Sequence, residues 1–445
     1  MLGLFDIVLK LAIGLFALAV AAVTTLFMIG DDELSPAVVE AMTDRPRLPA
    51  KRNAFYLIAG IQAPANFVPE EHAHSAVTRI NAIVEDPVAL SDPTTSDRVR
   101  HAWVKPDIGL SLPAGLICDL RAGACAAQLR KRVDGILKAA GDNALLLQRY
   151  ERLTEFPEYR FDLRYRAMTP QMNGQTLTEL HKLWLARALV NADVPAIYND
   201  IAHLRTLIGQ ADHLLSKLAL IDMLANSMHV YAVFTDAGPQ AAALLPELLL
   251  FDEGAFDLEP SLLAEFRSMA HTILHSEESV RREVAASNKS VESLGSMSGY
   301  RAMFKPKRTV NFVFACIQEA IRRSARSIAP LELRPTCEID PLEKVLNPIG
   351  AMVVHATYVE FSGVGPAIRD MDGLVVLVNA KRHLVAEATP PDQVDRFLRE
   401  RRGVLFHPHT GEPVWWDQKS RELYFPGSSE EGFANLPYVP LPSLQ

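Results

Sequence analysis

Apolar residues recur at helical spacing through the middle of the chain. The clearest helix starts near Thr176, and one of its faces carries Leu177, Leu180, Trp184 and Ala188. An Asn-Ala-Asp turn follows at 191–193, where Asp193 is a suitable cap for a second helix with Pro195 in its first turn. The stripe then repeats twice, at Ile197, Ile201, Leu204 and Ile208, and at Leu214, Leu218, Ile221, Leu224 and Met228. Three amphipathic helices joined by short turns predict antiparallel α-hairpins, without the fixed period of a regular repeat.

Similar spacing predicts helices on both sides of this block and a small β element after them. The further helical ranges are 124–139, 144–153, 261–287, 309–328, 368–388 and 391–403. Three short apolar runs separated by turn residues, within 404–425, predict a β-meander or hairpin. The expected fold class is therefore mainly α: an amino-terminal transmembrane helix, a multi-helix α-hairpin body and a small β-hairpin or meander near the carboxyl end.

The transmembrane helix in this prediction is residues 11–29, an uncharged stretch from Leu11 to Ile29. As a helix it would extend roughly 28 Å, the hydrocarbon thickness of a bilayer. Lys10 and the terminal amine precede it and acidic residues follow it, which predicts a cytoplasmic amino terminus and a body outside the cytoplasm. A cleaved signal peptide is an alternative, since residues 19–21 (AVA) fit a cleavage pattern. The apolar run continues to Ile29, which favours an uncleaved anchor; a buried core helix is the third interpretation.

Composition divides the chain into five predicted segments. Residues 31–48 are acidic and contain proline, and 84–115 holds prolines among Ser and Asp clusters, so both are expected to be irregular. The stretch 52–64 predicts either a strand or a short helix packed on the body. The segments are a transmembrane anchor (1–30), a tether and irregular wrapping segment (31–115), a helical body (116–330), a helical part with a small β element (331–425) and a proline-rich tail (426–445).

The four cysteines fall into two pairs. Cys118 and Cys125 bracket a short polar loop, and Cys316 and Cys337 are separated by a helical segment and a turn. In an oxidising compartment two local disulfides are the expected pairing. Four cysteines allow three connectivities, and free buried thiols are the alternative. A zinc or redox site is disfavoured because neither pair has CxxC spacing.

The charge balance limits the classes of partner. The chain of 445 residues has a formal net charge of −8 and a pI near 5.9, so nucleic acid is not expected as a partner. No polybasic run follows residues 11–29 to attract anionic lipid. The expected partners are the inner membrane, through Leu11 to Ile29, and another protein of the envelope.

No residue is assigned to catalysis, to a cofactor or to a metal. The sequence lacks GxSxG, SxxK and GxxxxGK[ST] motifs, and it has no GxGxxG after a strand. Three histidine pairs have spacings that metal sites use, but surface or turn histidines explain them more simply: His72/His74, His271/His275 and His407/His409. Three carboxylates could line a glycan cleft, although an exposed ion-paired segment is the simpler explanation: Glu155, Glu158 and Asp162.

Several segments together resemble a known group of proteins. They are residues 52–64 (RNAFYLIAGIQAP), 116–125 (LICDLRAGAC) with 145–153 (LLLQRYERL), the helical block 185–224, 337–350 (CEIDPLEKVLNPIG) and 407–425 (HPHTGEPVWWDQKSRELYF). The set resembles uncharacterised proteobacterial single-pass membrane proteins that have one amino-terminal membrane helix and a mostly helical periplasmic body. The resemblance implies this location and architecture, and it brings no activity or catalytic residues with it.

The expected function is a membrane-anchored extracytoplasmic scaffold or binding protein of the bacterial envelope. Helical hairpins form grooves for proteins or peptides, and no catalytic constellation is recognised. The expected location is the inner membrane, with a single pass, the amino terminus in the cytoplasm and the body in the periplasm. The alternative is an envelope hydrolase acting on glycan or peptide through an unrecognised acidic or histidine site. A deep polar pocket with converging Asp, Glu or His would favour the hydrolase, and a broad apolar groove between helices with scattered histidines would favour binding.

Overall fold

A computed structural model gives the fold of this chain. It describes residues 30–43, 48–85, 94–103, 106–164, 174–286, 300, 303–325, 339–358, 364–401, 405–425 and 439–441. The predicted transmembrane stretch, Leu11 to Ile29, lies outside the described residues. Within them, one stretch is long and apolar enough to cross a membrane, Leu214–Ala237, and 72% of its apolar window is buried inside the protein. A core helix of a soluble protein passes the same test, so this stretch is weak support for a membrane span.

The described residues form 17 α-helices, five short 3₁₀-helices and three strands. The first helices are α2 (Pro36–Ala41), α3 (Ala54–Ala59), α4 (Pro69–Glu85), α5 (Thr95–Ala102), α6 (Cys125–Arg130), α7 (Val133–Asp142) and α8 (Ala144–Glu151). The central ones are α9 (Gly174–Val190), α10 (Val194–Gln210), α11 (Leu214–Val233), α12 (Pro239–Leu244) and α13 (Glu259–Ala286). The last are α15 (Pro306–Ala325), α16 (Pro341–Leu346), α17 (Pro348–Tyr358), α18 (Val364–Ala386) and α19 (Val394–Glu400). The 3₁₀-helices are η1 (Ala50–Arg52), η3 (Arg152–Glu155), η4 (Phe234–Ala237), η5 (Glu253–Phe256) and η6 (Pro391–Gln393).

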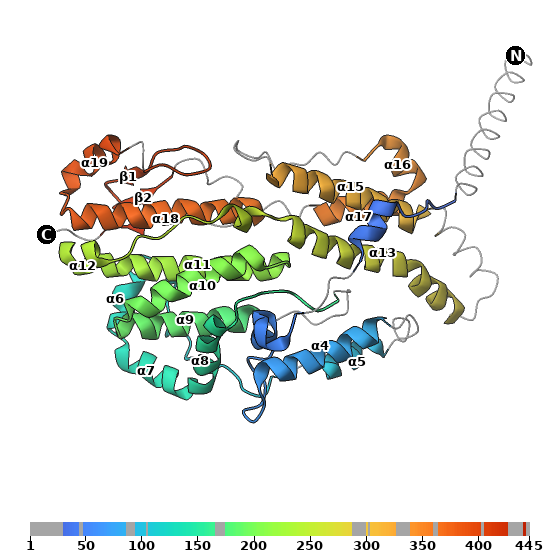
Figure 1. The fold of residues 1–445 in the computed structure, drawn as a ribbon, viewed down its shortest axis with the longest axis horizontal. Helices are drawn as coiled ribbons and strands as arrows, with labels where there is room; N and C mark the ends of the chain where they lie inside the picture. Colours follow the sequence, from blue (N-terminus) through green and yellow to red (C-terminus); the bar gives the residue numbers. More distant parts are fainter. Residues whose placement is uncertain are drawn as a thin grey trace, which may run out of the picture.

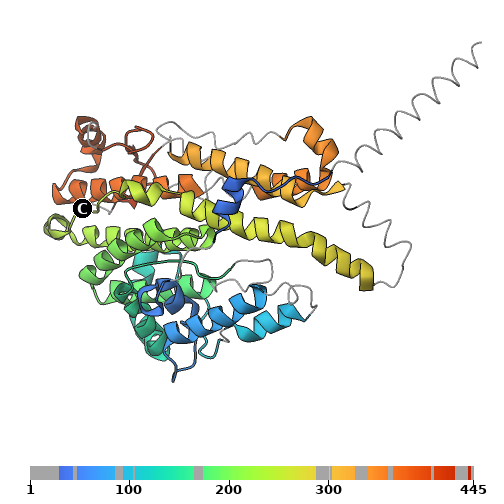
Figure 2. The ribbon, with the colours of Figure 1, turned by 45° about the vertical axis from the view of Figure 1, so that its right-hand side comes forward.

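The helices form stacked layers around one apolar core. Helices α9, α10 and α11 pack side by side, and α18 lies along the other side of α11 (Figure 1). Helix α13 packs against α15, which in turn packs against α17. Both views place α15 and α16 on the opposite side of the molecule from α7, α8 and α9 (Figures 1 and 2). The core is continuous from Val38 to Leu441, which makes the described body one hydrophobic unit.

The α-hairpins predicted from the apolar stripes are confirmed. Helix α9 ends in a Schellman motif, in which the N–H of Asp193 donates to the carbonyl of Ala188 at 2.9 Å and Ala192 adopts a φ of 54°. The Asp193 side chain then accepts from the N–H of Ala196 at 3.2 Å and begins α10. The stripe residues of all three helices face the core; Leu204, Ile208 and Leu224 are fully buried.

The small sheet near the carboxyl end is also confirmed. Strands β1 (Trp415–Asp417) and β2 (Glu422–Tyr424) form an antiparallel hairpin with Trp416 opposite Leu423. Strand β3 (Val439–Pro440) pairs antiparallel with β2 and completes a three-stranded sheet. The buried Leu423 faces the helical body because β2 and β3 pack against α18.

Two segments are more regular than their composition indicates. The expected tether contains α2, whose Val38 is fully buried, and the expected irregular range 84–115 contains α5. Tertiary burial overrides the local composition in both cases. For the stretch 52–64, the helical alternative is confirmed: it holds α3, which Asn53 caps by accepting from the N–H of Phe55 at 3.1 Å. The domain boundaries predicted from composition remain predictions.

The first predicted disulfide is confirmed. Cys118 and Cys125 are bonded with a Cα–Cα distance of 5.6 Å, inside the expected window of about 4.4–6.8 Å. No described cysteine is a free thiol. Cys316 is buried on α15, and Cys337 lies outside the described residues, so their mutual pairing stays a prediction.

Candidate functional site

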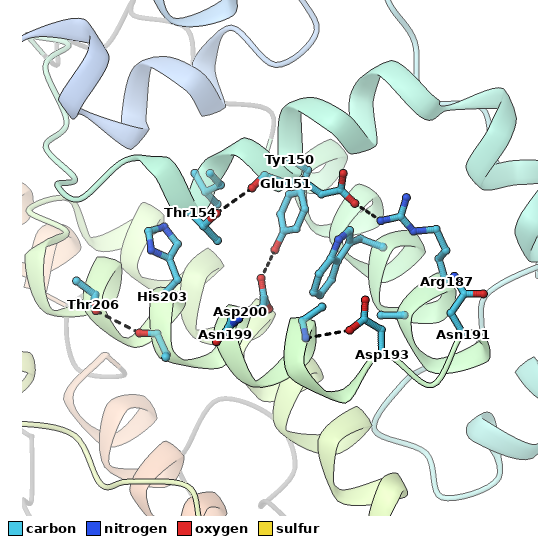
Figure 3. A pocket seen from close by; sticks show the side chains of 15 residues that line it. Tyr150, Glu151, Thr154, Arg187, Asn191, Asp193, Asn199, Asp200, His203 and Thr206 are labelled. Carbon is cyan, nitrogen blue, oxygen red and sulfur yellow. Dashed lines mark hydrogen bonds and ion pairs between the residues drawn. The ribbon is translucent and has the colours of Figure 1, made fainter. Parts of the chain in front are cut away.

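A cleft of about 760 Å³ opens between the end of α8, η3 and the facing sides of α9 and α10 (Figure 3). This volume lies within the range of ligand pockets, and the cleft is open to solvent on one side. Its lining residues are Tyr150, Glu151, Leu153, Thr154, Trp184, Arg187, Ala188, Asn191, Asp193, Ala196, Asn199, Asp200, Ala202, His203 and Thr206.

The hairpin turn sets the shape of this cleft. The tight end of α9 places Arg187 and Asn191 on one wall, and α10 returns with Asn199 and His203 on the other. The floor is aromatic, because the rings of Tyr150 and Trp184 lie 5.6 Å apart between the walls. Both asparagines line the cleft and are exposed. The cleft thus combines an apolar floor with walls that can donate and accept hydrogen bonds.

A buried polar network lies beneath the floor, centred on Asp200. Its Oδ1 accepts from the hydroxyl of Tyr150 at 2.8 Å, and its Oδ2 accepts from the hydroxyl of Ser227 at 2.7 Å. The Nε2 atom of His181 lies 3.2 Å from Asp200 Oδ2 and 3.0 Å from Ser227 Oγ. Burial, followed by the charge of Asp200, raises the pKa of Tyr150 well above its ordinary value. These hydrogen bonds therefore satisfy the Asp200 carboxylate inside the core.

Serine, histidine and aspartate meet here without the geometry of a catalytic triad. In a triad the acid orients one ring nitrogen of histidine while the other nitrogen takes the serine proton. Here Asp200 and Ser227 share the same nitrogen of His181, and His181 Nδ1 is buried without a hydrogen-bond partner. His181 and Ser227 are also fully buried, so a substrate in the cleft does not reach the hydroxyl. The network joins α8, α9, α10 and α11 and supports the cleft from below.

The other ionisable groups of the cleft are held in structural contacts. Glu151 forms an ion pair with Arg187 across one end, and Asp193 caps α10. Burial lowers the pKa of His203, which keeps the imidazole neutral at pH 7, and its Nε2 atom is buried without a partner. No carboxylate of the cleft remains as an unengaged acid or base beside a nucleophile. The arrangement is suited to hydrogen bonding with a ligand.

The histidine pairs singled out in the sequence lie elsewhere and make structural contacts. His72 and His74 are on α4, where their rings contact Phe67 and Tyr56. His407 Nδ1 accepts from the N–H of His409 at 3.2 Å. The remaining contacts of these pairs are His409 with Asp372 at 2.8 Å and His275 with the carbonyl of His271 at 2.8 Å. The described residues contain no group of three or more His, Cys, Asp or Glu arranged to hold a metal ion.

The three candidate carboxylates are separated by their partners. Glu155 pairs with Arg152 at 3.3 Å, and Glu158 pairs with Arg52. Asp162 accepts from the hydroxyl of Tyr56 at 2.9 Å. The Glu155 contact lies within η3, whereas Glu158 and Asp162 join the segment 156–164 to η1 and α3. Glu155 and Glu158 match the ion-paired segment that the sequence favoured, and Asp162 is held by a hydrogen bond instead.

The four residues of the buried network were not predicted from the sequence. Each of them is a polar residue at a helical position that faces the core, and this pattern could have identified them. Asp200 interrupts the stripe of Ile197, Ile201 and Leu204, and His181 falls on the same face as Leu177 and Trp184. Polar residues in such stripes indicate a partner inside the core, but the sequence does not say which one.

The fold and site define a mainly helical protein with an open interhelical cleft above a buried polar network. No family model matches the chain, and comparisons with curated proteins and with solved structures give no match either.

Proposed function

We propose that this chain is a membrane-anchored binding protein of the bacterial envelope, which holds an extended segment of a partner protein in the cleft between α8 and α10. The periplasm is the compartment in this proposal, and residues 11–29 are the anchor. The observation that carries the binding function is the cleft itself, in which an aromatic floor lies between walls of exposed amide groups.

The chemistry of the cleft supports a polypeptide ligand. The amides of Asn191 and Asn199 each offer a donor and an acceptor, which matches the alternating N–H and C=O groups of an extended backbone. Trp184 and Tyr150 are buried beneath the cleft, where their packed rings form a rigid apolar floor. An opening on one side lets a chain enter and leave without threading. Hydrolysis is less well supported, because Asp200, Glu151 and Asp193 are all engaged by structural partners.

The location rests on two separate features. The disulfide between Cys118 and Cys125 is typical of proteins outside the cytoplasm. The apolar stretch 11–29, with Lys10 before it and acids after it, favours a retained anchor with the body on the outside. A fusion of alkaline phosphatase to the carboxyl end should be active in cells, whereas an inactive fusion beside a fluorescent cytoplasmic reporter would contradict the proposed topology.

A display library of unstructured peptides tests the binding function. The full-length protein in nanodiscs should enrich peptides, and replacing Asn191 and Asn199 together by Ala should weaken their binding by at least tenfold. Gln128→Ala is the matched control, since it removes an exposed amide from α6 outside the cleft. Enriched peptides that bind the cleft variant and the control equally well would contradict the proposed site.

A further inference from the structure

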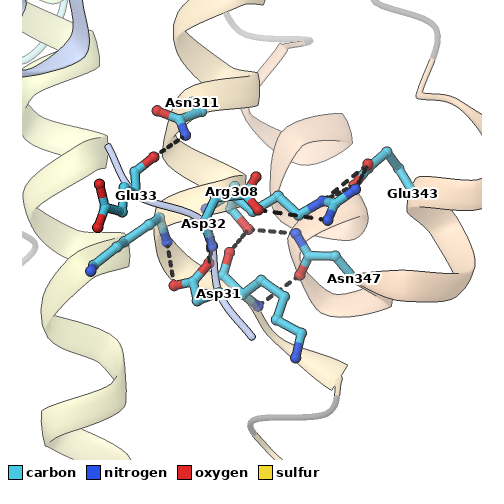
Figure 4. A network of polar contacts seen from close by, with 10 residues as sticks. Asp31, Asp32, Glu33, Arg308, Asn311, Glu343 and Asn347 are labelled. Atoms are coloured by element: carbon cyan, nitrogen blue, oxygen red, sulfur yellow. Dashed lines mark hydrogen bonds and ion pairs between the residues drawn. The ribbon is translucent and has the colours of Figure 1, made fainter. Parts of the chain in front are cut away.

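The first described residues of the chain are fastened to the start of α15 (Figure 4). The carboxylate of Asp31 accepts from the N–H groups of Lys307 at 2.9 Å and Arg308 at 3.0 Å. Helix α15 begins with Pro306, so Asp31 satisfies the next two N–H groups of the first turn, a capping role usually filled by a residue adjacent in sequence. We call the contacts of 31–35 with α15 the clamp.

Asn311 extends the clamp by one further turn. Its Oδ1 atom accepts from the N–H of Ser35 at 3.0 Å, and its Nδ2 atom donates to the carbonyl of Glu33 at 2.9 Å. Beyond this point, α2 continues into the fold, where Arg267 of α13 donates to the carbonyl of Ala41 at 2.7 Å. The segment expected to be a loose tether is thus bound at both ends.

The clamp is also joined to α16 and α17. Arg308 lies 3.8 Å from Asp32 and forms a two-pronged contact with Glu343 of α16, with one bond at 2.8 Å. Asn347, between α16 and α17, accepts from the N–H of Lys305 at 2.9 Å and donates to Thr309 at 2.9 Å. Much of the acidic charge after residue 29 is therefore offset by Arg308 and by the amino-terminal end of α15.

The spacing from the apolar stretch to the clamp is short. Only Gly30 separates Ile29 from Asp31, and two Cα–Cα steps span at most about 7.6 Å. The polar headgroup layer on each side of a bilayer is roughly 5–8 Å thick. If residues 11–29 span the membrane, which rests on the proposed function, the first turn of α15 lies at the depth of the headgroups or directly above them.

Exposed residues around this turn suit a lipid surface. Met303 is 49% exposed just before α15, and Lys307 is exposed within its first turn. Val345 is 59% exposed on α16, two residues before Asn347, which bonds to the start of α15. Exposed apolar side chains together with a lysine are typical of surfaces that rest in the interfacial region of a bilayer.

From the clamp, we infer that Met303, Lys307 and Val345 form a face that rests on the lipid headgroups of the bilayer that holds the anchor. The clamp fixes the orientation of the body, which does not swing on a flexible tether. The cleft between α8 and α10 then lies on the side of the body away from this face, because α15 and α16 are opposite α8 and α9 in both views (Figures 1 and 2). The cleft accordingly receives its ligand from the aqueous compartment.

Fluorescence quenching by lipid tests this face. Met303→Cys is labelled with bimane in the full-length protein, which is reconstituted in vesicles of phosphatidylethanolamine and phosphatidylglycerol that carry a headgroup spin label. The unsubstituted chain serves as the labelling blank. The matched control is Leu244→Cys, which is 85% exposed on α12 at the other end of the molecule. Quenching at residue 303 should exceed quenching at residue 244 at least threefold. Resistance to carbonate extraction shows that the protein is inserted in the membrane. Equal quenching at the two positions in such inserted protein overturns the proposed face.

The clamp is tested by a second pair of variants. Replacing Asp31 and Asn311 together by Ala should reduce the quenching at residue 303 at least twofold, because the body is no longer held against the bilayer. Asp417→Ala removes a comparable contact to a backbone N–H, in the β1–β2 turn, and should leave the quenching unchanged. Unchanged quenching in the clamp variant overturns the role of the clamp. If carbonate extracts the unaltered protein from the membrane, residues 11–29 are not an anchor and the proposed function is contradicted. This result is separate from the quenching results, which test only the face and the clamp.

Discussion

At the scale of single residues, Asp200 is the centre of the polar network beneath the cleft. Its carboxylate accepts from Tyr150 and Ser227 and contacts His181, and it is 5% exposed. Asp200→Ala would leave the Tyr150 hydroxyl in the core without its acceptor and would remove one of the two acceptors of Ser227. We expect a loss of about 3–5 kcal/mol in the free energy of unfolding, measured by urea denaturation.

Asp193→Ala is the control for this change. Asp193 lines the same cleft but is exposed and serves only as the cap of α10, so its removal should cost about 1 kcal/mol. If both variants lose the same small amount, Asp200 does not organise the core beneath the cleft.

His213 makes the free energy of unfolding depend on pH in the acidic range. Burial lowers its pKa from 6.5 to about 4, so the folded state keeps the imidazole neutral while the unfolded chain takes up a proton below pH 6.5. The contribution of His213 is complete above pH 6.5 and is lost as the pH falls toward 4, by at most about 1.4 kcal/mol per unit. His213→Asn keeps an acceptor at the amino-terminal end of α11 and should reduce the pH dependence of the unfolding free energy across this window. The remaining dependence comes from His229 and His407, because burial lowers the pKa of both.

The control for His213 replaces an exposed histidine, His101 on α5, by Asn. That variant should keep the acid sensitivity of the unaltered chain. Equal slopes between pH 6.5 and 4 in all three proteins would show that His213 is not the group responsible.

At the scale of helices, close packing of α15 against α17 depends on Gly350. A Cβ atom at this position would lie 2.2 Å from both Asn347 Nδ2 and Thr309 Oγ1, so Gly350→Ala must displace the bridge that joins the two helices. We expect the unfolding free energy to fall by about 1–3 kcal/mol. Gly141→Ala on α7 is the matched control: it has open space around it and should be neutral or stabilising by about 0.5–1 kcal/mol. A neutral result at Gly350 would contradict the tight approach.

The helices that the sequence predicts well are those with long local patterns. Repeated apolar positions and the Asp193 cap determine the α9–α10–α11 hairpins within the segment itself. The short helix α2 was missed because contacts distant in sequence stabilise it. The N–H of Ser35, which caps α2, donates to Asn311 of α15, 276 positions away.

At the scale of the whole molecule, the polar network and the cleft arise from helices that meet only in three dimensions. The sequence shows Asp200, His181 and Ser227 as isolated polar residues in apolar stripes, and the packing of α9, α10 and α11 brings them within hydrogen-bond distance. The cleft likewise needs α8, which is separated from α9 by residues 152–173. Spacing along one helix does not contain this information. The predicted helical body and terminal sheet, by contrast, followed from local patterns alone.

The central claim for the whole molecule is that a partner protein binds in the cleft between α8 and α10. Site-specific photocrosslinking in intact cells tests this claim most directly, with the photoreactive residue at position 199 in the cleft and, as the control, at position 128 on α6. We predict a discrete crosslinked protein at position 199 that is absent at position 128 and is lost when Asn191 is replaced by Ala. No adduct at position 199, or the same adducts at both positions, would contradict the account.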